Sequence, residues 1–220
     1  MKYLLFLLLA PLAFAFPAEA FSPIVTEVSV PYQIVSIDEY ADSRHDFLGE
    51  LKDYPIMYEI SVDEEADLQV QISQRFVSEA EPIPFSLIVV RKNDRGGGVK
   101  EVVRQKLSSE DWAVEKNSML GMDFWQGPVL SESVQAGTYR IEISTPKNEG
   151  RYMLSFGSLD SVDIGFFDSL SSIRTTQKFF GHSFFRMFVS SYVYWPLGIA
   201  VLGFLAYRLW FYRKLFTHVD

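Results

Sequence analysis

The feature that most constrains this chain is a long uncharged run near its C-terminal end. Residues 187–207 contain no Asp, Glu, Lys, Arg or His. About 20 apolar residues in a helix match the thickness of the hydrocarbon core of a bilayer. Aromatic residues cluster at both ends of the run: Tyr192, Tyr194, Trp195, Tyr207 and Trp210. Such rings commonly lie among lipid headgroups, so we predict one transmembrane helix over residues 187–209.

The two chain ends predict on which side of the membrane each part lies. A basic residue, an apolar run and a small-x-small pattern ending at Ala20 are typical of a secretory signal peptide, residues 1–20. An uncleaved N-terminal anchor is the alternative. Three basic residues follow the uncharged run that ends at Tyr207: Arg208, Arg213 and Lys214. Because basic residues flank the cytoplasmic end of such helices, we expect a single-pass protein of the cell membrane with residues 210–220 as a short cytoplasmic tail.

The composition excludes several classes of function. Asp and Glu number 28 against 20 Lys and Arg, for a net charge of −8, so the surface would repel nucleic acid. The chain has no cysteine, which excludes disulfides, thiolate zinc sites, iron–sulfur clusters and a lipoprotein anchor. An exported domain without disulfides must rely on a sizeable apolar core.

Alternating apolar and polar residues predict β-strands between the two ends. The segments are residues 56–62, 66–74, 85–90, 99–107, 138–144 and 151–157. In one of them, Tyr139, Ile141 and Ile143 alternate with polar or charged neighbours, so one face of the strand is apolar. Short strands separated by regular turn signals predict an all-β fold, an antiparallel, jelly-roll-like β-sandwich over residues 21–157.

The strand sequences also resemble a known family. YEISVDEEADLQVQI, followed later by VQAGTYRIEISTPKNEGRYMLSFG, is similar to the bacterial pre-peptidase C-terminal type of β-sandwich domain. The matching positions are Asp67, Leu68, Gly137, Thr138, Tyr139, Gly150, Tyr152 and Leu154. The resemblance covers residues 54–157 and implies an accessory, non-catalytic module, often attached to secreted enzymes. Here a membrane anchor follows the domain instead of an enzyme.

The segment between the sandwich and the span, residues 158–186, changes in character. Apolar residues recur at helical spacing: Phe167, Leu170, Ile173 and Phe180. Arg174 and Lys178 lie among them. This pattern predicts an amphipathic juxtamembrane helix at the outer membrane interface, with its aromatic face toward the lipid. The alternative is that the helix packs back on the sandwich.

One aromatic segment is a candidate binding site. Residues 108–128 lack clear periodicity and predict a long loop that carries Trp112, Phe124 and Trp125. Long loops with exposed aromatic side chains are common binding sites in sandwich domains. These rings could stack on a sugar or anchor a protein partner. The alternative is that Trp112 and Trp125 cap the core.

Two further groups of residues could bind a metal ion or act in catalysis. Asp63, Glu64, Glu65 and Asp67 form an acidic run that could hold calcium, a cation that takes several oxygen ligands. The run lacks the spacing of an EF-hand, and a solvated turn is the alternative. His45 lies near Asp42 and Asp46, which permits a metal or general-base role and hence a hydrolase.

The sequence as a whole predicts a binding module rather than an enzyme. No nucleophile elbow, zinc-protease helix or phosphate-cradling loop occurs in it. We predict a non-catalytic interaction module outside the cell membrane, with the lipid bilayer and a protein or glycan as partners, no nucleic acid and no cofactor unless calcium binds. A carbohydrate- or cell-wall-binding protein that uses Trp112 and Trp125 is the alternative.

Overall fold

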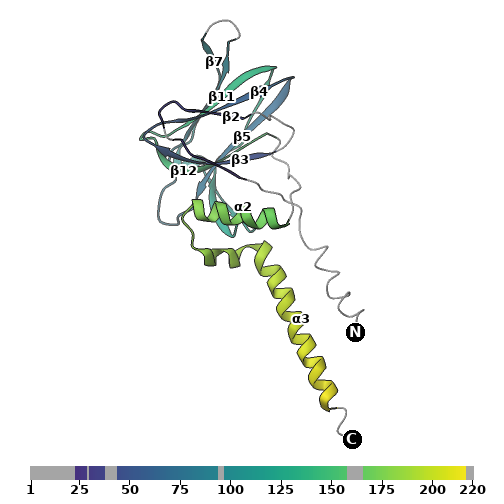
Figure 1. Cartoon of the computed structure of the whole chain (residues 1–220). Helices are drawn as coiled ribbons and strands as arrows, with labels where there is room; N and C mark the ends of the chain where they lie inside the picture. Colours follow the sequence, from purple (N-terminus) through teal and green to yellow (C-terminus); the bar gives the residue numbers. More distant parts are fainter. Residues whose placement is uncertain (1–22, 29, 38–43, 94–96, 158–165, 217–220) are drawn as a thin grey trace.

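The computed structural model describes residues 23–28, 30–37, 44–93, 97–157 and 166–216. These residues form two β-sheets packed face to face, with α2 (Phe166–Phe179) at their lower end and α3 (Ser191–Phe216) extending away from the sandwich (Figure 1). The predicted signal peptide, residues 1–20, lies outside the described residues. The prediction of an all-β sandwich followed by one apolar helix is confirmed.

The two sheets are mixed rather than purely antiparallel. The seven-stranded sheet has the order β1 (Ile24–Thr26), β3 (His45–Lys52), β12 (Glu149–Phe156), β5 (Ala66–Arg75), β9 (Met122–Gln126), β8 (Ala113–Asn117), with β10 (Leu130–Val134) also on β5. The five-stranded sheet has the order β2 (Ile34–Ile37), β4 (Ile56–Val62), β11 (Gly137–Ser144), β6 (Ser86–Lys92), β7 (Val99–Lys106). The antiparallel prediction is wrong at two edges, because β1 pairs with β3 and β2 pairs with β4 in parallel.

The strand alternation read from the sequence points into the space between the sheets. Leu68, Val70 and Ile72 of β5 face Tyr139 and Ile141 of β11 across one apolar core. The Tyr139 hydroxyl donates a hydrogen bond to the main-chain oxygen of Gln135 at 2.6 Å, and this bond fixes the entry into β11 as a tyrosine corner does in other sandwiches.

A buried tyrosine pair crosses this core. The hydroxyl oxygens of Tyr58 and Tyr152 lie 3.0 Å apart, and Tyr58 also donates to Thr26 at 3.4 Å. Burial raises the pKa of Tyr152 well above its ordinary value, so the hydroxyl stays protonated. The Tyr152 ring lies over Gly49, where an added Cβ would come within 2.4 Å of it, so only glycine fits there.

The segment predicted as one long loop is mostly regular structure, and that prediction is wrong. Residues 108–128 contain a short 3-10 helix, η2 (Ser109–Asp111), followed by the β8–β9 hairpin. β8 is the edge strand of its sheet, and its side chains are exposed whichever face they point to, except that of the last residue, Asn117. Alternation is therefore absent from its sequence, which is why the strand was missed.

Three helices follow the sandwich. They are α2 (Phe166–Phe179), the 3-10 helix η3 (Phe184–Val189) and α3 (Ser191–Phe216). Helix α2 packs on the outer face of the seven-stranded sheet, where Ile173 and Phe180 join Leu48 and Met153 in a second apolar cluster. The structure thus agrees with the alternative expectation, in which this helix packs back on the sandwich.

Helix α3 is long and apolar enough to cross a membrane. Its apolar stretch, Ser191–Tyr212, has a mean hydropathy of 1.3, and none of its most apolar window is buried against the rest of the chain. The helix begins at Ser191 and not at Met187, because residues up to Val189 form η3, which lies across the top of α3 (Figure 1). Pro196 lies in its second turn, within the helix.

Candidate functional site

The best-defined feature outside the core is the attachment of the helices to the sandwich, which we call the helix joint. Four consecutive main-chain oxygens of the β8–β9 turn each accept a hydrogen bond from residues 177–191. The pairs are Ser191 N to Ser118 (2.9 Å), Ser190 Oγ to Met119, Gln177 Nε2 to Leu120 (2.7 Å) and Arg186 Nε to Gly121 (2.7 Å). Two of these bonds attach the start of α3 to the turn, and the other two attach α2 and η3 to it.

The local sequence explains why residues 177–191 can approach this turn so closely. Gly121 has a φ of +64°, which favours glycine, and an added Cβ would lie 2.8 Å from the main-chain nitrogen of Ser190. Asn117 accepts a hydrogen bond from the Leu120 N–H at 2.8 Å and shapes the turn from the other side. The turn is thus built to face the chain at Ser190.

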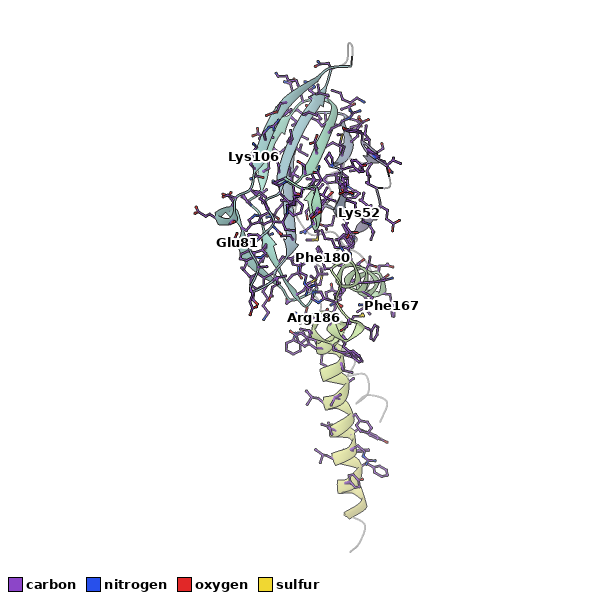
Figure 2. All side chains as sticks on the ribbon, turned by 90° about the vertical axis from the view of Figure 1, so that its left-hand side faces the viewer. Lys52, Glu81, Lys106, Phe167, Phe180 and Arg186 are labelled. Atoms are coloured by element: carbon purple, nitrogen blue, oxygen red, sulfur yellow. The ribbon has the colours of Figure 1, made fainter. Side chains whose placement is uncertain are left out.

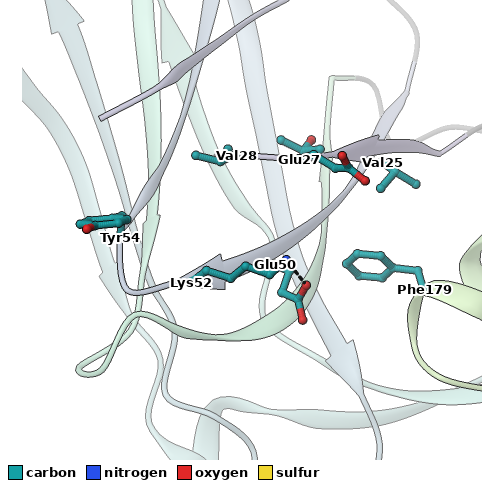
Figure 3. A pocket seen from close by; sticks show the side chains of 8 residues that line it. Val25, Glu27, Val28, Glu50, Lys52, Tyr54 and Phe179 are labelled. Carbon is teal, nitrogen blue, oxygen red and sulfur yellow. Dashed lines mark ion pairs between the residues drawn. The ribbon is translucent and has the colours of Figure 1, made fainter. Parts of the chain in front are cut away.

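A groove of about 490 Å³ opens on the same side of the molecule, between β1, β3 and the end of α2 (Figure 3). We call it the β1–α2 groove. It is lined by Val25, Thr26, Glu27, Val28, Glu50, Lys52, Tyr54 and Phe179. Its apolar part comes from Val25, Val28, Tyr54 and Phe179, and its charged part from Glu27 and from Glu50 and Lys52 of β3.

Two of the charged side chains that line the β1–α2 groove, Glu50 and Lys52, form an ion pair. Glu50 lies 2.9 Å from Lys52 and 2.8 Å from Arg151. Burial alone would raise the pKa of Glu50, but the hydrogen bonds from Lys52 and Arg151 outweigh burial and hold this pKa below its ordinary value. Arg151 also lies over the Phe179 ring, 5.6 Å from its centroid, and donates to the Phe179 main-chain oxygen. The groove is therefore a preformed surface with a carboxylate held ionised.

The aromatic residues predicted as a binding site do not lie together. Trp112 is buried in the core between the sheets, where its ring packs against Phe85. Phe124 is buried on the opposite face of the sheet, against Phe180 of the α2 end. Trp125 is half-buried and packs edge-on against Phe76. Two of the three rings are thus core residues, as the alternative proposed for Trp112.

The acidic run lies at an exposed connection. Asp63, Glu64 and Glu65 join β4 to β5, and Asp67 lies on β5. Among the described residues, no three His, Cys, Asp or Glu side chains are grouped so as to hold a metal ion. Calcium binding here stays a prediction, which melting curves with and without a chelator would test.

The histidine weighed for catalysis is separated from its nearest acid. His45 and Asp46 are neighbours on β3 and therefore point to opposite faces of the sheet. The His45 ring stacks on Phe156, while the buried Asp46 carboxylate accepts hydrogen bonds from Arg44 and Ser155. Asp42 lies outside the described residues.

Sequence reasoning missed the residues that line the β1–α2 groove. They come from three distant segments, and no local motif connects them. One signal was present: Phe47 and Leu51 of β3 are apolar and alternate with Glu50 and Lys52, which must therefore face outward. The exposure of Val25 and Tyr54 depends on tertiary packing and has no signature in the sequence.

The comparisons with known proteins give no family model and no curated protein that matches this chain. Similar solved structures include the pre-peptidase C-terminal domain of a Bacillus anthracis collagenase, with 11% identity over 59% of this chain and 98% of that one, at a TM-score of 0.34. A Yersinia pseudotuberculosis-derived mitogen shares 12% identity over 55% of this chain and 90% of its own, with a TM-score of 0.36.

A periplasmic inhibitor of g-type lysozyme from Aeromonas hydrophila is similar at 13% identity over 61% of this chain and 97% of its own, with a TM-score of 0.31. The collagenase domain belongs to the family that residues 54–157 resemble in sequence, so the structural comparison returns the same weak resemblance.

Proposed function

We propose that this chain is a non-catalytic binding module that α3 anchors in a membrane, with the sandwich on the extracytoplasmic side. The observation that carries the proposal is the helix joint. An apolar helix with an exposed surface leaves the sandwich at a turn that accepts four hydrogen bonds, two from the start of α3 and one each from α2 and η3. A rigid attachment of this kind suits a domain that must be presented at a fixed height and angle to the bilayer.

The predicted chain ends support the orientation. Residues 1–20 would direct export, and residues 21–157 would then fold outside. Residues 158–186 would connect the sandwich to the span at 187–209, and the basic Arg208, Arg213 and Lys214 would hold residues 210–220 inside.

Within this function, the β1–α2 groove is the proposed contact for a protein partner, such as another subunit of an envelope complex. It combines exposed apolar side chains, Val25 and Tyr54, with the charged pair Glu50–Lys52. An apolar patch with a few fixed charges fits a protein segment, because burial supplies affinity and the charges supply register.

Site-specific crosslinking in intact membranes tests the contact. A photoreactive phenylalanine analogue would replace Tyr54 in the groove or, as a control, Val114, which is similarly exposed on β8. We expect one stoichiometric crosslinked protein from position 54 and none from position 114. Equal products from both positions, or none from either, would refute the groove as the contact.

Anchoring is tested separately. Carbonate-washed membranes should retain the chain, and protease added outside should remove the sandwich while sparing the span. Release by carbonate would refute the anchor, whereas digestion only after lysis would reverse the proposed orientation.

A further inference from the structure

Three arginine side chains gather around the turn that joins α2 to η3, at the end of the sandwich from which α3 leaves. Figure 2 labels Phe180 and Arg186 at this end. Each arginine donates one hydrogen bond to a main-chain oxygen: Arg75 to Phe180 (2.9 Å), Arg174 to His182 (3.3 Å) and Arg186 to Gly121 (2.7 Å). A guanidinium has five N–H donors, so each retains donors for another acceptor.

Most arginines of the sandwich body pair with a carboxylate, although Arg91 bonds the Ala136 main-chain oxygen instead. The arginine ion pairs of the described residues are Arg44–Asp46, Arg104–Glu101, Arg140–Glu59 and Arg151–Glu50. None of these ion pairs includes Arg75, Arg174 or Arg186. Three guanidinium groups outside these ion pairs therefore lie around one turn, in a chain whose net charge is −8.

The environment of His182 also indicates that positive charge gathers at this turn. Its Nε2 atom is buried and has no hydrogen-bond partner among the described residues. Burial lowers the pKa of His182, and the charges of Arg75 and Arg186 lower it further. Two of the guanidinium groups thus lie close enough to repel a proton on this imidazole.

An exposed aromatic rim lies next to the arginines, toward α3. It consists of Phe184, Phe185 and Phe188 on η3 and of Tyr194 and Trp195 in the first turn of α3. The Arg174 guanidinium lies 5.6 Å from the centre of the Phe184 ring and so connects the rim to the cationic cluster. Exposed rings at the end of an apolar helix are typical of the boundary between acyl chains and headgroups.

We propose that Arg75, Arg174 and Arg186 form a binding site for the phosphate of an anionic phospholipid headgroup, with the aromatic rim seated at the acyl boundary beneath it. The proposal rests on the proposed anchoring by α3, which brings this end of the sandwich to the bilayer. Guanidinium groups match phosphate oxygens in charge and in hydrogen-bond geometry. Arg174 contacts Phe184 of the rim, and Arg186 lies at the end of the sandwich from which α3 leaves (Figure 2), so the cluster would face the headgroup region when α3 spans the bilayer.

Lipid binding by the purified full-length chain tests the site. Native mass spectrometry in mild detergent would compare retention of phosphatidylglycerol and phosphatidylcholine with identical acyl chains. We expect a preference for phosphatidylglycerol that falls as salt rises. The double variant Arg75→Gln, Arg174→Gln should reduce it by about fivefold per arginine, roughly 25-fold in all.

The controls separate charge at this site from charge in general and from folding. The double variant Lys100→Gln, Lys106→Gln removes the same charge from β7, and Figure 2 shows Lys106 away from α3. This variant should keep the preference for phosphatidylglycerol. Arg75→Lys, Arg174→Lys keeps the charge and should recover most of it, which a merely structural loss would not predict. Arg186 is left intact in these variants, because it also bonds the helix joint.

Each outcome decides one point. Equal retention of both lipids by a chain that stays in carbonate-washed membranes would overturn the lipid site and leave the anchor standing. Displacement of phosphatidylglycerol by an equal concentration of inorganic phosphate would overturn lipid selectivity. If the glutamine variant does not fold, the salt dependence of the unaltered chain decides: a preference that salt leaves unchanged would overturn the site.

Discussion

The two faces of the seven-stranded sheet are covered in different ways. The inner face meets the second sheet, and its buried side chains are mostly apolar, with the hydroxyls of Tyr58, Tyr152 and Thr26 as a small hydrogen-bonded group. The outer face meets α2 and the helix joint. Its contacts include buried polar side chains: Asp46, Ser155, Ser169, Ser172, Thr176, Gln177 and Ser190.

This difference separates what folds the domain from what orients it. Apolar contact alone is tolerant of small shifts, whereas hydrogen bonds to main-chain oxygens need defined positions. The inner face therefore supplies most of the stability, and the outer face fixes the angle between sandwich and span. The following changes test that division, beginning with the largest expected effect.

Truncation on the inner face should destabilise the whole domain. Leu154 is fully buried on β12, and Leu154→Ala should cost about 2–5 kcal/mol, because it leaves a cavity between the sheets. Thermal unfolding of the full chain in detergent would measure the loss. Val114→Ala, at an exposed position of β8, is the control and should change stability by less than ~0.5 kcal/mol. A similar loss from both variants would contradict a core at Leu154.

A methyl group at the helix joint should alter orientation more than stability. Gly121→Ala puts a side chain in the left-handed region, which costs about 1–2 kcal/mol, and pushes against Ser190. Because the chain has no cysteine, spin labels can be placed cleanly at Val129→Cys and Leu202→Cys. Their distance distribution should be narrow in the parent and broad in the variant.

The matched control for this change is Gly97→Ala. An added Cβ at Gly97 meets nothing within 4 Å, so the label distances should stay as in the parent. An unchanged distribution for Gly121→Ala as well would show that the joint does not set the angle of α3.

The tyrosine pair on the inner face should show an asymmetric effect. Tyr58 bonds both Tyr152 and Thr26, so Tyr152→Phe removes one hydrogen bond and should cost about 0.5–1.5 kcal/mol. Tyr58→Phe leaves two buried hydroxyls without that partner and should cost more. Thermal unfolding of the two single variants checks the order, and the reverse order would contradict this bonding scheme.

The inner face was largely predictable from the sequence, and the outer face was not. β4 matches the prediction at both ends, since Ile56, Tyr58 and Ile60 alternate with more exposed neighbours. On α2, the predicted apolar stripe is only partly buried: Ile173 is enclosed, yet Phe167 is 80% exposed. Polar residues such as Gln177 occupy the buried face, so apolar periodicity could not give the orientation of the helix.

The candidate sites show the same limit. Trp112 is buried in the core, as the alternative expects, and Trp125 is half-buried against it. β9 sends Phe124 and Trp125 to opposite faces, which only the strand assignment reveals. The groove and the arginine cluster join residues far apart in sequence, for example Arg75 and Phe180. Long-range register decides such contacts, and a single sequence carries no local signal for it.

The smallest expected effect is a pH dependence at the outer face. The pKa of His182 is held below 6.5 in the folded chain by burial and by Arg75 and Arg186. The unfolded chain therefore takes up a proton at a higher pH than the folded chain does. Stability from this group is present above about pH 6.5 and is lost as the pH falls through the folded pKa.

Two variants test the direction of this pH dependence of stability. His182→Gln should lose less melting temperature than the parent between about pH 7.5 and about pH 5, because it has no imidazole to protonate. Arg75→Gln should also reduce the loss, since removing a nearby positive charge lets the folded His182 accept its proton at a higher pH. If both variants lose as much as the parent over this range, the acid sensitivity arises elsewhere, and the cationic field at the α2–η3 turn is weaker than its geometry indicates.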